Sequence, residues 1–239
     1  MIVPFSDCIT AEDERCLVEK ISVSENVHIR RIRENKCLDH LAISPRILCS
    51  NNSISNVYNA TVRPHLSNNP LWSVRLMMSR CFGYLDSGIA YVPLADQFNH
   101  STLEFHTRIR QEQDAYVFYA ESRIEKNREI FSNYGIDSEI EMFVSHGFVD
   151  AGMLDSFVYL RLGEGLLVKV NVKDPAIFPP ELNVYDNRAL LVRLLADVVD
   201  GMIDSTQQID LRALSPVERT LVGTDLKNLK FFKSQLALV

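Results

Sequence analysis

Three short segments of the chain carry the side chains that could do chemistry. The first contains the polar pair Asn99-His100, the second ends in Tyr134-Gly135, and the third places His146 directly before Gly147. Each segment alone has an ordinary structural interpretation, because Asn99-His100 could make polar contacts at a helix terminus and Tyr134-Gly135 could form a turn. The order and spacing of the three segments together therefore carry the functional prediction.

Taken together, the segments resemble the C-terminal half of a SET domain. The resemblance is to the class of SET-domain protein methyltransferases typified by the Rubisco large-subunit methyltransferase. Ser138 and Glu141 match a further motif of this class, and Ser79-Arg80 matches its Ser-Arg pair on the preceding helix. The specific part of the match runs from about Trp72 to Asp150. The three segments are Val92-Pro-Leu-Ala-Asp-Gln-Phe-Asn-His-Ser101, Glu129-Ile-Phe-Ser-Asn-Tyr-Gly135 and Phe143-Val-Ser-His-Gly-Phe-Val149.

The resemblance implies a cofactor and roles for individual residues. In this class the Asn-His pair contacts S-adenosylmethionine, so Asn99 and His100 would bind that cofactor. Arg80 and Asp96 fall at positions that support the same pocket. Tyr134 falls at the active-site tyrosine, which borders the cofactor and whose hydroxyl lies near the transferring methyl group. No metal is expected.

The resemblance also implies a substrate channel with His146 and Phe148 at its wall. The class often has tyrosine where this sequence has His146. A histidine there could accept a hydrogen bond or alter the selectivity for the amine. It could equally be a residue packed at the end of a helix, and the sequence leaves both interpretations open.

Methyl transfer to an amine mainly requires alignment. The reaction is an in-line displacement at a sulfonium carbon, so the protein must align a neutral amine with that carbon. A narrow apolar channel lowers the pKa of a lysine amine because it disfavours the charged form. A tyrosine oxygen can orient the amine and the polarised methyl group without adding a full charge.

The resemblance predicts an S-adenosylmethionine-dependent protein N-methyltransferase that acts on a lysine side chain of a non-histone protein. The class lacks the cysteine-rich zinc-binding flank of many histone-directed SET enzymes, and these 239 residues contain none. Two alternatives remain open. The chain could be a catalytically inactive, SET-derived module that binds a protein segment. It could also methylate histidine, because some members of the class have lost the tyrosine that His146 replaces.

The match begins after one element of the class. In a SET domain, an N-terminal strand with a G-x-G turn cradles the methionine end of the cofactor, whereas Ile2-Val-Pro-Phe5 to Ile9-Thr10 resembles the segment immediately after that strand. No glycine precedes Gly83, and Gly163-Glu-Gly165 fits a hairpin turn better. Because only glycine allows such a close backbone approach, we expect a chain starting at Met1 to bind S-adenosylmethionine weakly and to leave a sheet edge unpaired.

Composition restricts the partners and the compartment. The net charge of −6 argues against nucleic acid as a partner and is compatible with a basic protein segment. No apolar run approaches the roughly 18 residues of a membrane span, and the first residues lack the basic start of a secretory signal. The 5 cysteines include no C-x-x-C pair and fit free thiols in a reducing compartment. We expect a cytoplasmic protein, with the nucleus or an organelle as alternatives, and no membrane partner.

A mixed fold must position these residues. We expect an α+β SET domain of small twisted sheets, with a helical insert and a shortened helical C-terminal lobe. Residues 1–150 would form a partial SET domain, with an insert at about 10–88 and the catalytic half at 89–150, and residues 151–239 a helical substrate-binding-like lobe. In the class, the C-terminal segment threads under a loop, and this pseudoknot would place Asn99-His100 beside the Tyr134 segment.

Two patterns predict helices in the N-terminal half. Thr10 and Asp13 resemble a capping box that opens a helix through Lys20. Asn69-Pro70 predicts the start of a buried apolar helix from Leu71 to Tyr84.

The C-terminal half contains clearer signals. Ser138 with Glu141 predicts a short helix that ends at Gly147, and Ser215 with Glu218 predicts the start of another. The other expected elements are a strand at Ile2, strands at Ala115–Ala120 and Glu129–Phe131 with a turn at Lys126-Asn127 between them, a hairpin of Phe157–Arg161 with Leu166–Asn171, and a helix after Asp186.

Overall fold

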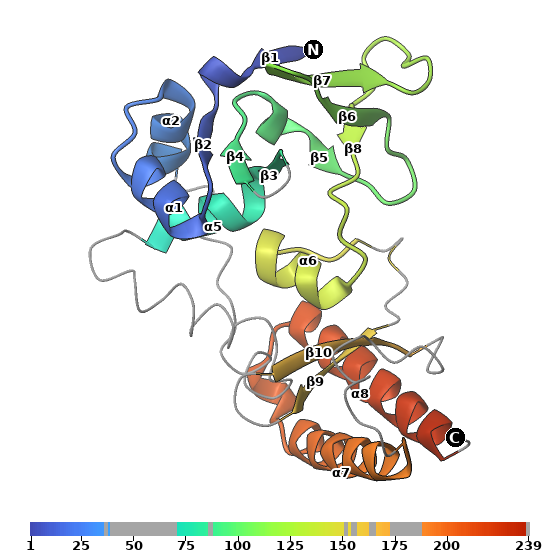
Figure 1. Ribbon diagram of the computed structural model, residues 1–239. Coiled ribbons are helices and arrows are strands. Elements are labelled where there is room, and N and C mark those ends of the chain that lie inside the picture. The colour runs from blue at the N-terminus through green and yellow to red at the C-terminus, as the bar shows by residue number, and fades with distance from the viewer. Residues whose placement is uncertain are drawn as a thin grey trace. The chain divides into compact units, whose positions relative to one another are not determined.

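The computed structural model describes residues 1–35, 38, 71–85, 88–150, 153, 157–162, 166–172 and 188–237. These residues form two compact units (Figure 1). The first unit holds the described residues up to Ile136 together with 145–153, and the second holds 137–144 and the described residues from 157 onward. The domain boundary near residue 150 stays a prediction. The expected cap Asn69-Pro70 and the turn Gly163-Glu-Gly165 lie outside the described residues.

A five-stranded sheet in the first unit carries the Asn-His pair. β1 (Ile2–Pro4) and β6 (Thr107–Gln111) flank β7 (Ala115–Ala120) in antiparallel pairing. In contrast, β8 (Phe131–Ser132) runs parallel to both β6 and β5 (Asn99–His100). Asn99 pairs with Phe131 and His100 with Ser132, so the sheet places the Asn-His strand beside the segment that leads to Tyr134. The order of the strands across the sheet is β1, β7, β6, β8 and β5.

The predicted strands at Ile2 and Ala115–Ala120 are confirmed, but β8 is shorter than expected. The strand begins only at Phe131. The Phe131 backbone N–H donates to His106 Nδ1 at 3.3 Å and not to the backbone of a neighbouring strand. The turn at Lys126-Asn127 is confirmed, with Asn127 at a φ of 66°, a conformation that asparagine tolerates. Within the described residues, β1 and β5 form the two edges of this sheet.

A second, three-stranded sheet corrects the predicted helix Leu71–Tyr84. Its order is β2 (Ile9–Ala11), β4 (Gly88–Tyr91) and β3 (Cys81–Tyr84), all antiparallel. The helix α5 spans only Leu71–Arg80. The predicted helix was too long at its C-terminal end. Aromatic residues pack well in a sheet, and pairing with β4 stabilises Cys81–Tyr84 as a strand more than its helical pattern stabilises a helix. Residues 73, 74, 76 and 77 of α5 are buried, as expected.

The predicted capping box at Thr10 is wrong, because Thr10 belongs to β2. Asp13 itself is the cap of α1 (Glu14–Ser22), and its carboxylate accepts from the Cys16 N–H at 2.6 Å. A second helix, α2 (Val27–Asn35), follows. The patterns did not reveal it, although the Asn26 side chain accepts from the His28 N–H at 2.9 Å, as a cap does.

The core of the first unit joins its two sheets. It contains Val3 of β1 and Ala90 of β4 together with Tyr116 and Phe118 of β7. Phe82 of β3 meets Phe118 edge to face, with ring centroids 5.9 Å apart, an arrangement that aromatic pairs prefer. This packing fixes the chain between β4 and β5, where the predicted site residues lie.

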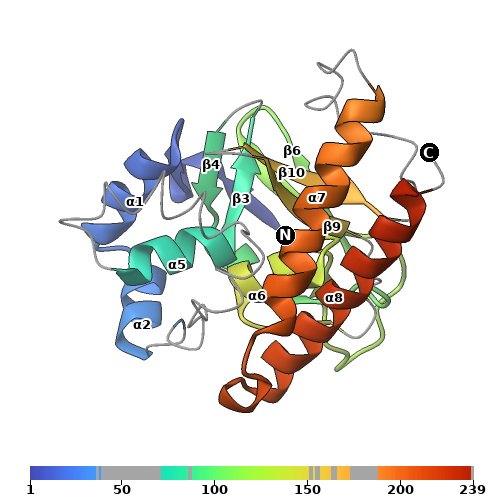
Figure 2. The same cartoon turned by 90° about the horizontal axis from the view of Figure 1, so that it is seen from below.

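The second unit combines a hairpin with two long helices. β9 (Phe157–Leu162) and β10 (Leu166–Asn171) pair antiparallel, which confirms the predicted hairpin. The helices α7 (Arg188–Gln207) and α8 (Pro216–Leu236) pack against each other and against β9 (Figure 2). The capping box of Ser215 and Glu218 is confirmed. The shared core includes Val158, Leu160, Val170, Leu195, Leu229 and Phe232.

The short helix α6 (Glu139–His146) begins and ends as predicted. The Ser138 hydroxyl accepts from the Glu141 N–H at 3.5 Å, and Gly147 follows the helix at a φ of 80°. Lys169 of β10 lies 2.6 Å from an oxygen of Asp137 and 3.1 Å from one of Glu141, which anchors the start of α6 to the hairpin. Among the described helices, none is long and apolar enough to cross a membrane.

Candidate active site

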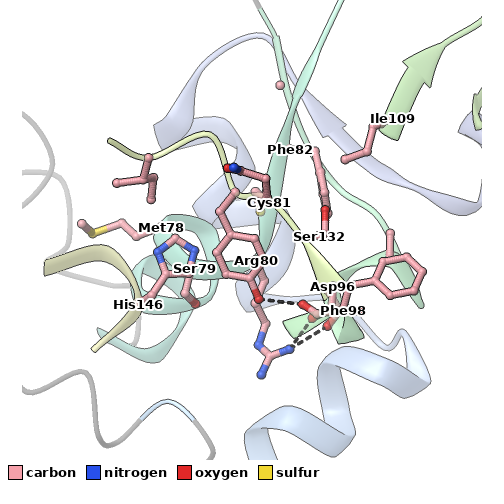
Figure 3. Close-up of a pocket in the computed structure, with 15 residues that line it drawn as sticks. Met78, Ser79, Arg80, Cys81, Phe82, Asp96, Phe98, Ile109, Ser132 and His146 are labelled. Atoms are coloured by element: carbon pink, nitrogen blue, oxygen red, sulfur yellow. Dashed lines mark hydrogen bonds and ion pairs between the residues drawn. The ribbon is translucent and has the colours of Figure 1, made fainter. Parts of the chain in front are cut away.

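A pocket of about 260 Å³ lies within the first unit (Figure 3). Its wall is built from the end of α5, from β3, from the short helix η3 (Ala95–Gln97), from Ile109 of β6 and from the residues that follow β8. The pocket brings together four residues that the sequence singles out, namely Arg80, Asp96, Tyr134 and His146. These four come from segments distant in sequence, as a binding site requires.

An ion pair between Arg80 and Asp96 forms one wall. Arg80 Nη1 donates to the Asp96 backbone oxygen at 2.8 Å and to Asp96 Oδ2 at 3.1 Å, as the dashed lines of Figure 3 show. The Asp96 side chain is fully buried, whereas that of Arg80 is 24% exposed. The Tyr91 hydroxyl also donates to Asp96 Oδ2, at 3.4 Å, and burial raises the pKa of Tyr91, which keeps this donor protonated.

Two polar atoms of this wall have no hydrogen-bond partner among the described residues. They are Arg80 Nε and Asp96 Oδ1, and both are buried. A buried donor or acceptor without a partner costs about 1–3 kcal/mol, so the hydrogen bonding of this ion pair is incomplete within the described residues.

Tyr134 is held at both ends. Its hydroxyl donates to the Phe98 backbone oxygen at 2.6 Å, and its backbone N–H donates to His100 Nδ1 at 3.2 Å. Burial raises the pKa of Tyr134, although the nearby Arg80 charge opposes the shift. The phenol therefore stays neutral in the pocket, and its oxygen lone pairs can accept a hydrogen bond because its proton is already engaged.

His100 lies behind Tyr134 and is not among the residues that line the pocket. Its side chain is fully buried, and Nε2 lies 3.1 Å from the Thr102 hydroxyl and 3.4 Å from Asp150 Oδ2. Burial lowers the pKa of His100, although the Asp150 charge raises it. Both ring nitrogens are thus engaged by the protein, and the contact of His100 with a cofactor stays a prediction.

Asn99 and Phe148 also lie outside the pocket lining. Asn99 is exposed, and its amide donates to Glu129 Oε1 at 2.5 Å. Phe148 is 38% exposed, with its ring centroid 6.2 Å from those of His100 and His146. Phe148 therefore belongs to an aromatic group behind the pocket, and its role in a substrate channel stays a prediction.

His146 lies both at a helix end and in the pocket lining, and its role in a substrate channel stays a prediction. It is the last residue of α6 and it lines the pocket, with its ring 4.7 Å from that of Tyr134. Burial, helped by repulsion from the Arg80 charge and from His100 when that ring is protonated, lowers the pKa of His146 to about 4. The imidazole is therefore neutral at physiological pH, and Nδ1 lies 2.7 Å from the Ser145 hydroxyl.

The pocket includes residues that the sequence prediction does not name. Phe98 and Ser132 lie inside the matched segments, so their position beside Asn99 and before Tyr134 is the signal that could have found them. Phe82 and Ile109 come from the two different sheets, and no local pattern shows that these strands meet. Within the described residues, no cluster of His, Cys, Asp and Glu could hold a metal ion.

Comparison with solved structures identifies the class of fold. The small sheets around the parallel β5–β8 pair form a SET domain, and the predicted α+β SET fold is confirmed. Neither protein-family models nor curated proteins give a match.

Two of the similar structures are the SET domain of LSMT and Rubisco LSMT. The SET domain of LSMT bound to lysine and AdoHcy has a TM-score of 0.59 and 14% identity, covering 99% of this chain and 81% of that one. Rubisco LSMT bound to AdoMet has a TM-score of 0.51 and 13% identity, covering 98% of this chain and 80% of that one. At such identities the likeness establishes the fold, and the roles of individual residues depend on their geometry.

Proposed function

We propose that the protein is an S-adenosylmethionine-dependent protein N-methyltransferase that acts on a lysine side chain of a non-histone protein. The observation that carries the proposal is the position of Tyr134, whose neutral hydroxyl is oriented by Phe98 in the pocket that also holds the Arg80–Asp96 pair. The similar structures contain AdoMet in one case and AdoHcy with lysine in the other, which supports the choice of cofactor and substrate.

The chemistry of the pocket fits S-adenosylmethionine. When bound, this cofactor supplies an electrophilic methyl group on a sulfonium. Arg80 and Asp96 place a guanidinium and a carboxylate in the pocket lining, and these charges would suit the carboxylate and the ammonium of the cofactor's amino-acid part. Phe82 and Phe98 add apolar surface to the same pocket.

The remaining wall suits a neutral amine. Tyr134 can accept a hydrogen bond from an amine N–H, because its own proton is donated to Phe98. His146 is neutral as well, since its pKa is lowered to about 4. A wall of neutral groups in a partly buried site disfavours an ammonium, so it promotes loss of the proton that lysine must release before it attacks.

The sequence composition supports the rest of the proposal. A net charge of −6 favours a basic protein segment as substrate and disfavours nucleic acid. Three cysteines in the described part of the chain, Cys8, Cys16 and Cys81, are free thiols, which favours a reducing compartment such as the cytoplasm. The non-histone assignment depends on the resemblance of the motifs to the Rubisco methyltransferase class.

A methyl-transfer assay tests the proposal. The protein is incubated with a cell extract and S-adenosylmethionine carrying a tritiated methyl group, and the labelled band is identified by mass spectrometry. Tyr134→Phe should lose the labelling, whereas Tyr119→Phe, which removes a hydroxyl that accepts from Arg110 on β6, should keep it.

The outcomes separate the alternatives. A labelled lysine supports the proposal, and a labelled histidine supports histidine methylation instead. Cofactor binding measured by calorimetry without any labelled band would favour the inactive binding module. Absence of both binding and labelling would contradict the proposed function.

A further inference from the structure

A chain of contacts leads from Asp150 through His100 to Tyr134. Asp150 Oδ2 lies 3.4 Å from His100 Nε2, and His100 Nδ1 accepts from the Tyr134 backbone N–H at 3.2 Å. The three residues come from separate segments, namely the chain after α6, strand β5 and the chain after β8. All of them belong to the first unit.

The direction of these bonds assigns the proton of the imidazole. Because the Tyr134 N–H points at Nδ1, that nitrogen must be unprotonated, and Nε2 carries the hydrogen of the neutral ring. The His100 side chain is fully buried, so the protein must provide the acceptor for Nε2–H. Two oxygens lie within reach of Nε2, the Thr102 hydroxyl at 3.1 Å and Asp150 Oδ2 at 3.4 Å. Of the two, only Asp150 carries a charge, and its side chain is 22% exposed.

Asp150 also holds the chain that carries His100. The same oxygen, Oδ2, accepts from the Thr102 backbone N–H at 2.7 Å. One carboxylate oxygen therefore lies beside the ring of His100 and binds the backbone of Thr102, whose hydroxyl also contacts that ring. A histidine with its tautomer and its backbone both fixed is a rigid acceptor for the Tyr134 N–H.

Tyr134 is consequently positioned from both ends of the residue. His100 holds its backbone N–H, and Phe98 holds its hydroxyl. The tyrosine ring lies between two imidazoles, with centroids 4.9 Å from His100 and 4.7 Å from His146. A shift of His100 would therefore move the backbone from which the tyrosine hydroxyl enters the pocket.

We propose that Asp150 is a positioning residue for the active-site tyrosine, acting through His100 by fixing its tautomer and its place behind Tyr134. The inference rests on the proposed function for the role of Tyr134, but the contacts that carry it do not depend on turnover. His100 becomes part of the support of the tyrosine, in addition to any contact with the cofactor.

The tautomer can be measured in the unaltered protein. With histidine labelled by ¹⁵N, the nitrogen shifts and their couplings to the ring protons show which nitrogen of His100 carries hydrogen. We expect the Nε2–H form near neutral pH. A ring protonated on Nδ1 would overturn the proposal, even if the protein methylates lysine well.

Variants of Asp150 test its effect on Tyr134. Asp150→Asn keeps an oxygen that can accept from Nε2–H and from Thr102, so it should retain the tautomer and lose less than about three-fold in kcat. Asp150→Ala should allow a mixture of tautomers and lower kcat about ten- to a hundred-fold, as misplacement of an aligned group does. The Kd of S-adenosylmethionine should change much less. Asp7→Ala, which removes an exposed carboxylate in the same unit, is the matched control.

The results of these experiments distinguish the role of Asp150 from the proposed function. If Asp150→Asn and Asp150→Ala behave alike, or if Asp150→Ala keeps the Nε2–H form and full kcat, Asp150 is not a positioning residue. If Asp150→Ala does not fold, two measurements still test the role of Asp150. They are the kcat of Asp150→Asn relative to the parent and the tautomer of His100 in the parent. Failure of the parent to methylate any protein would count against the proposed function. The ¹⁵N spectrum of His100 would still test the role of Asp150, because it reports the tautomer without turnover.

Discussion

Arg80 binds Asp96 through both the backbone oxygen and the carboxylate of the same residue, at 2.8 and 3.1 Å. The guanidinium therefore fixes the conformation of the turn as well as the charge. Leu94, two residues earlier, has a φ of 70° and a ψ of −38°, which is strained for a side chain of its size. The ion pair holds a turn that the local sequence disfavours, as is common at functional sites.

Removal of one partner of this pair should destabilise the fold. Asp96→Ala leaves Arg80 beside a buried position without its counter-charge, and breaking a buried pair typically costs about 3–5 kcal/mol. Urea denaturation should show a decrease in the free energy of unfolding near the lower end of this range, because Arg80 is partly exposed. Glu125→Ala, which breaks a pair with Arg123 whose side chains are 69% and 87% exposed, should change it by less than about 1 kcal/mol. Equal effects of the two substitutions would refute the structural role of Asp96.

Loss of the Tyr134 hydroxyl should affect turnover more than binding. Tyr134→Phe keeps the ring between the two histidines but removes the oxygen that would orient the amine. We expect a decrease in kcat on the order of a hundred-fold, with an unchanged Kd for S-adenosylmethionine in calorimetry. An unchanged kcat would remove Tyr134 from the active site.

Asn99 and His100 should respond differently to truncation. Asn99→Ala removes an exposed amide, so the melting temperature should stay the same, while the affinity for S-adenosylmethionine decreases if the predicted contact exists. His100→Ala removes a fully buried ring with partners at both nitrogens and should lower the melting temperature by several degrees. Equal melting temperatures of the two variants would contradict the buried network around His100.

Features with a local physical cause could be predicted from the sequence. The capping box at Ser215 and the left-handed positions at Asn127 and Gly147 are determined by nearby residues, and the structure shows them. The strand Ala115–Ala120 also emerges from its own alternating pattern. The resemblance to SET domains depends on the order of three motifs, which is why it led to the correct fold.

Features set by distant pairing could not be predicted in this way. Cys81–Tyr84 continues an apolar helical pattern and still becomes a strand, because β4 offers hydrogen bonds to it. The surroundings of His100 depend on Asp150 from another segment, so the sequence alone could not show that its ring is buried among protein partners. Ile109 and Phe82 reach the pocket from two sheets, a meeting that no single segment encodes.

The identity of residue 146 should influence the product. His146→Tyr places a hydroxyl and a larger ring beside Tyr134, which should change the space and the hydrogen bonds available to a methylated amine. We expect mass spectrometry to show a different ratio of mono-, di- and trimethyllysine. Identical ratios in variant and parent would place His146 outside the substrate channel, as a residue packed at the helix end.

His146 should also make stability depend on pH. Its pKa in the folded protein, about 4, lies below the value of 6.5 for an exposed histidine. Between these values the unfolded chain binds more protons, so the free energy of unfolding falls as the pH is lowered from 6.5 towards 4. Urea denaturation of the parent and of His146→Phe should show a steeper fall for the parent. Parallel profiles would contradict the burial of the imidazole.

The parallel position of β8 has a consequence for the order in which the molecule assembles. This strand has only two residues, and it pairs on one side with β5 and on the other with β6. Parallel pairing cannot be formed by a tight turn, so the β6–β7 hairpin should fold first and β8 should then insert beside it. An element with so few ladder bonds opens at low cost. Amide hydrogen exchange should therefore be faster at Ser132 and Tyr134 than at Tyr116 and Phe118. The segment that carries Tyr134 would be the last part of this sheet to fold and the first to open.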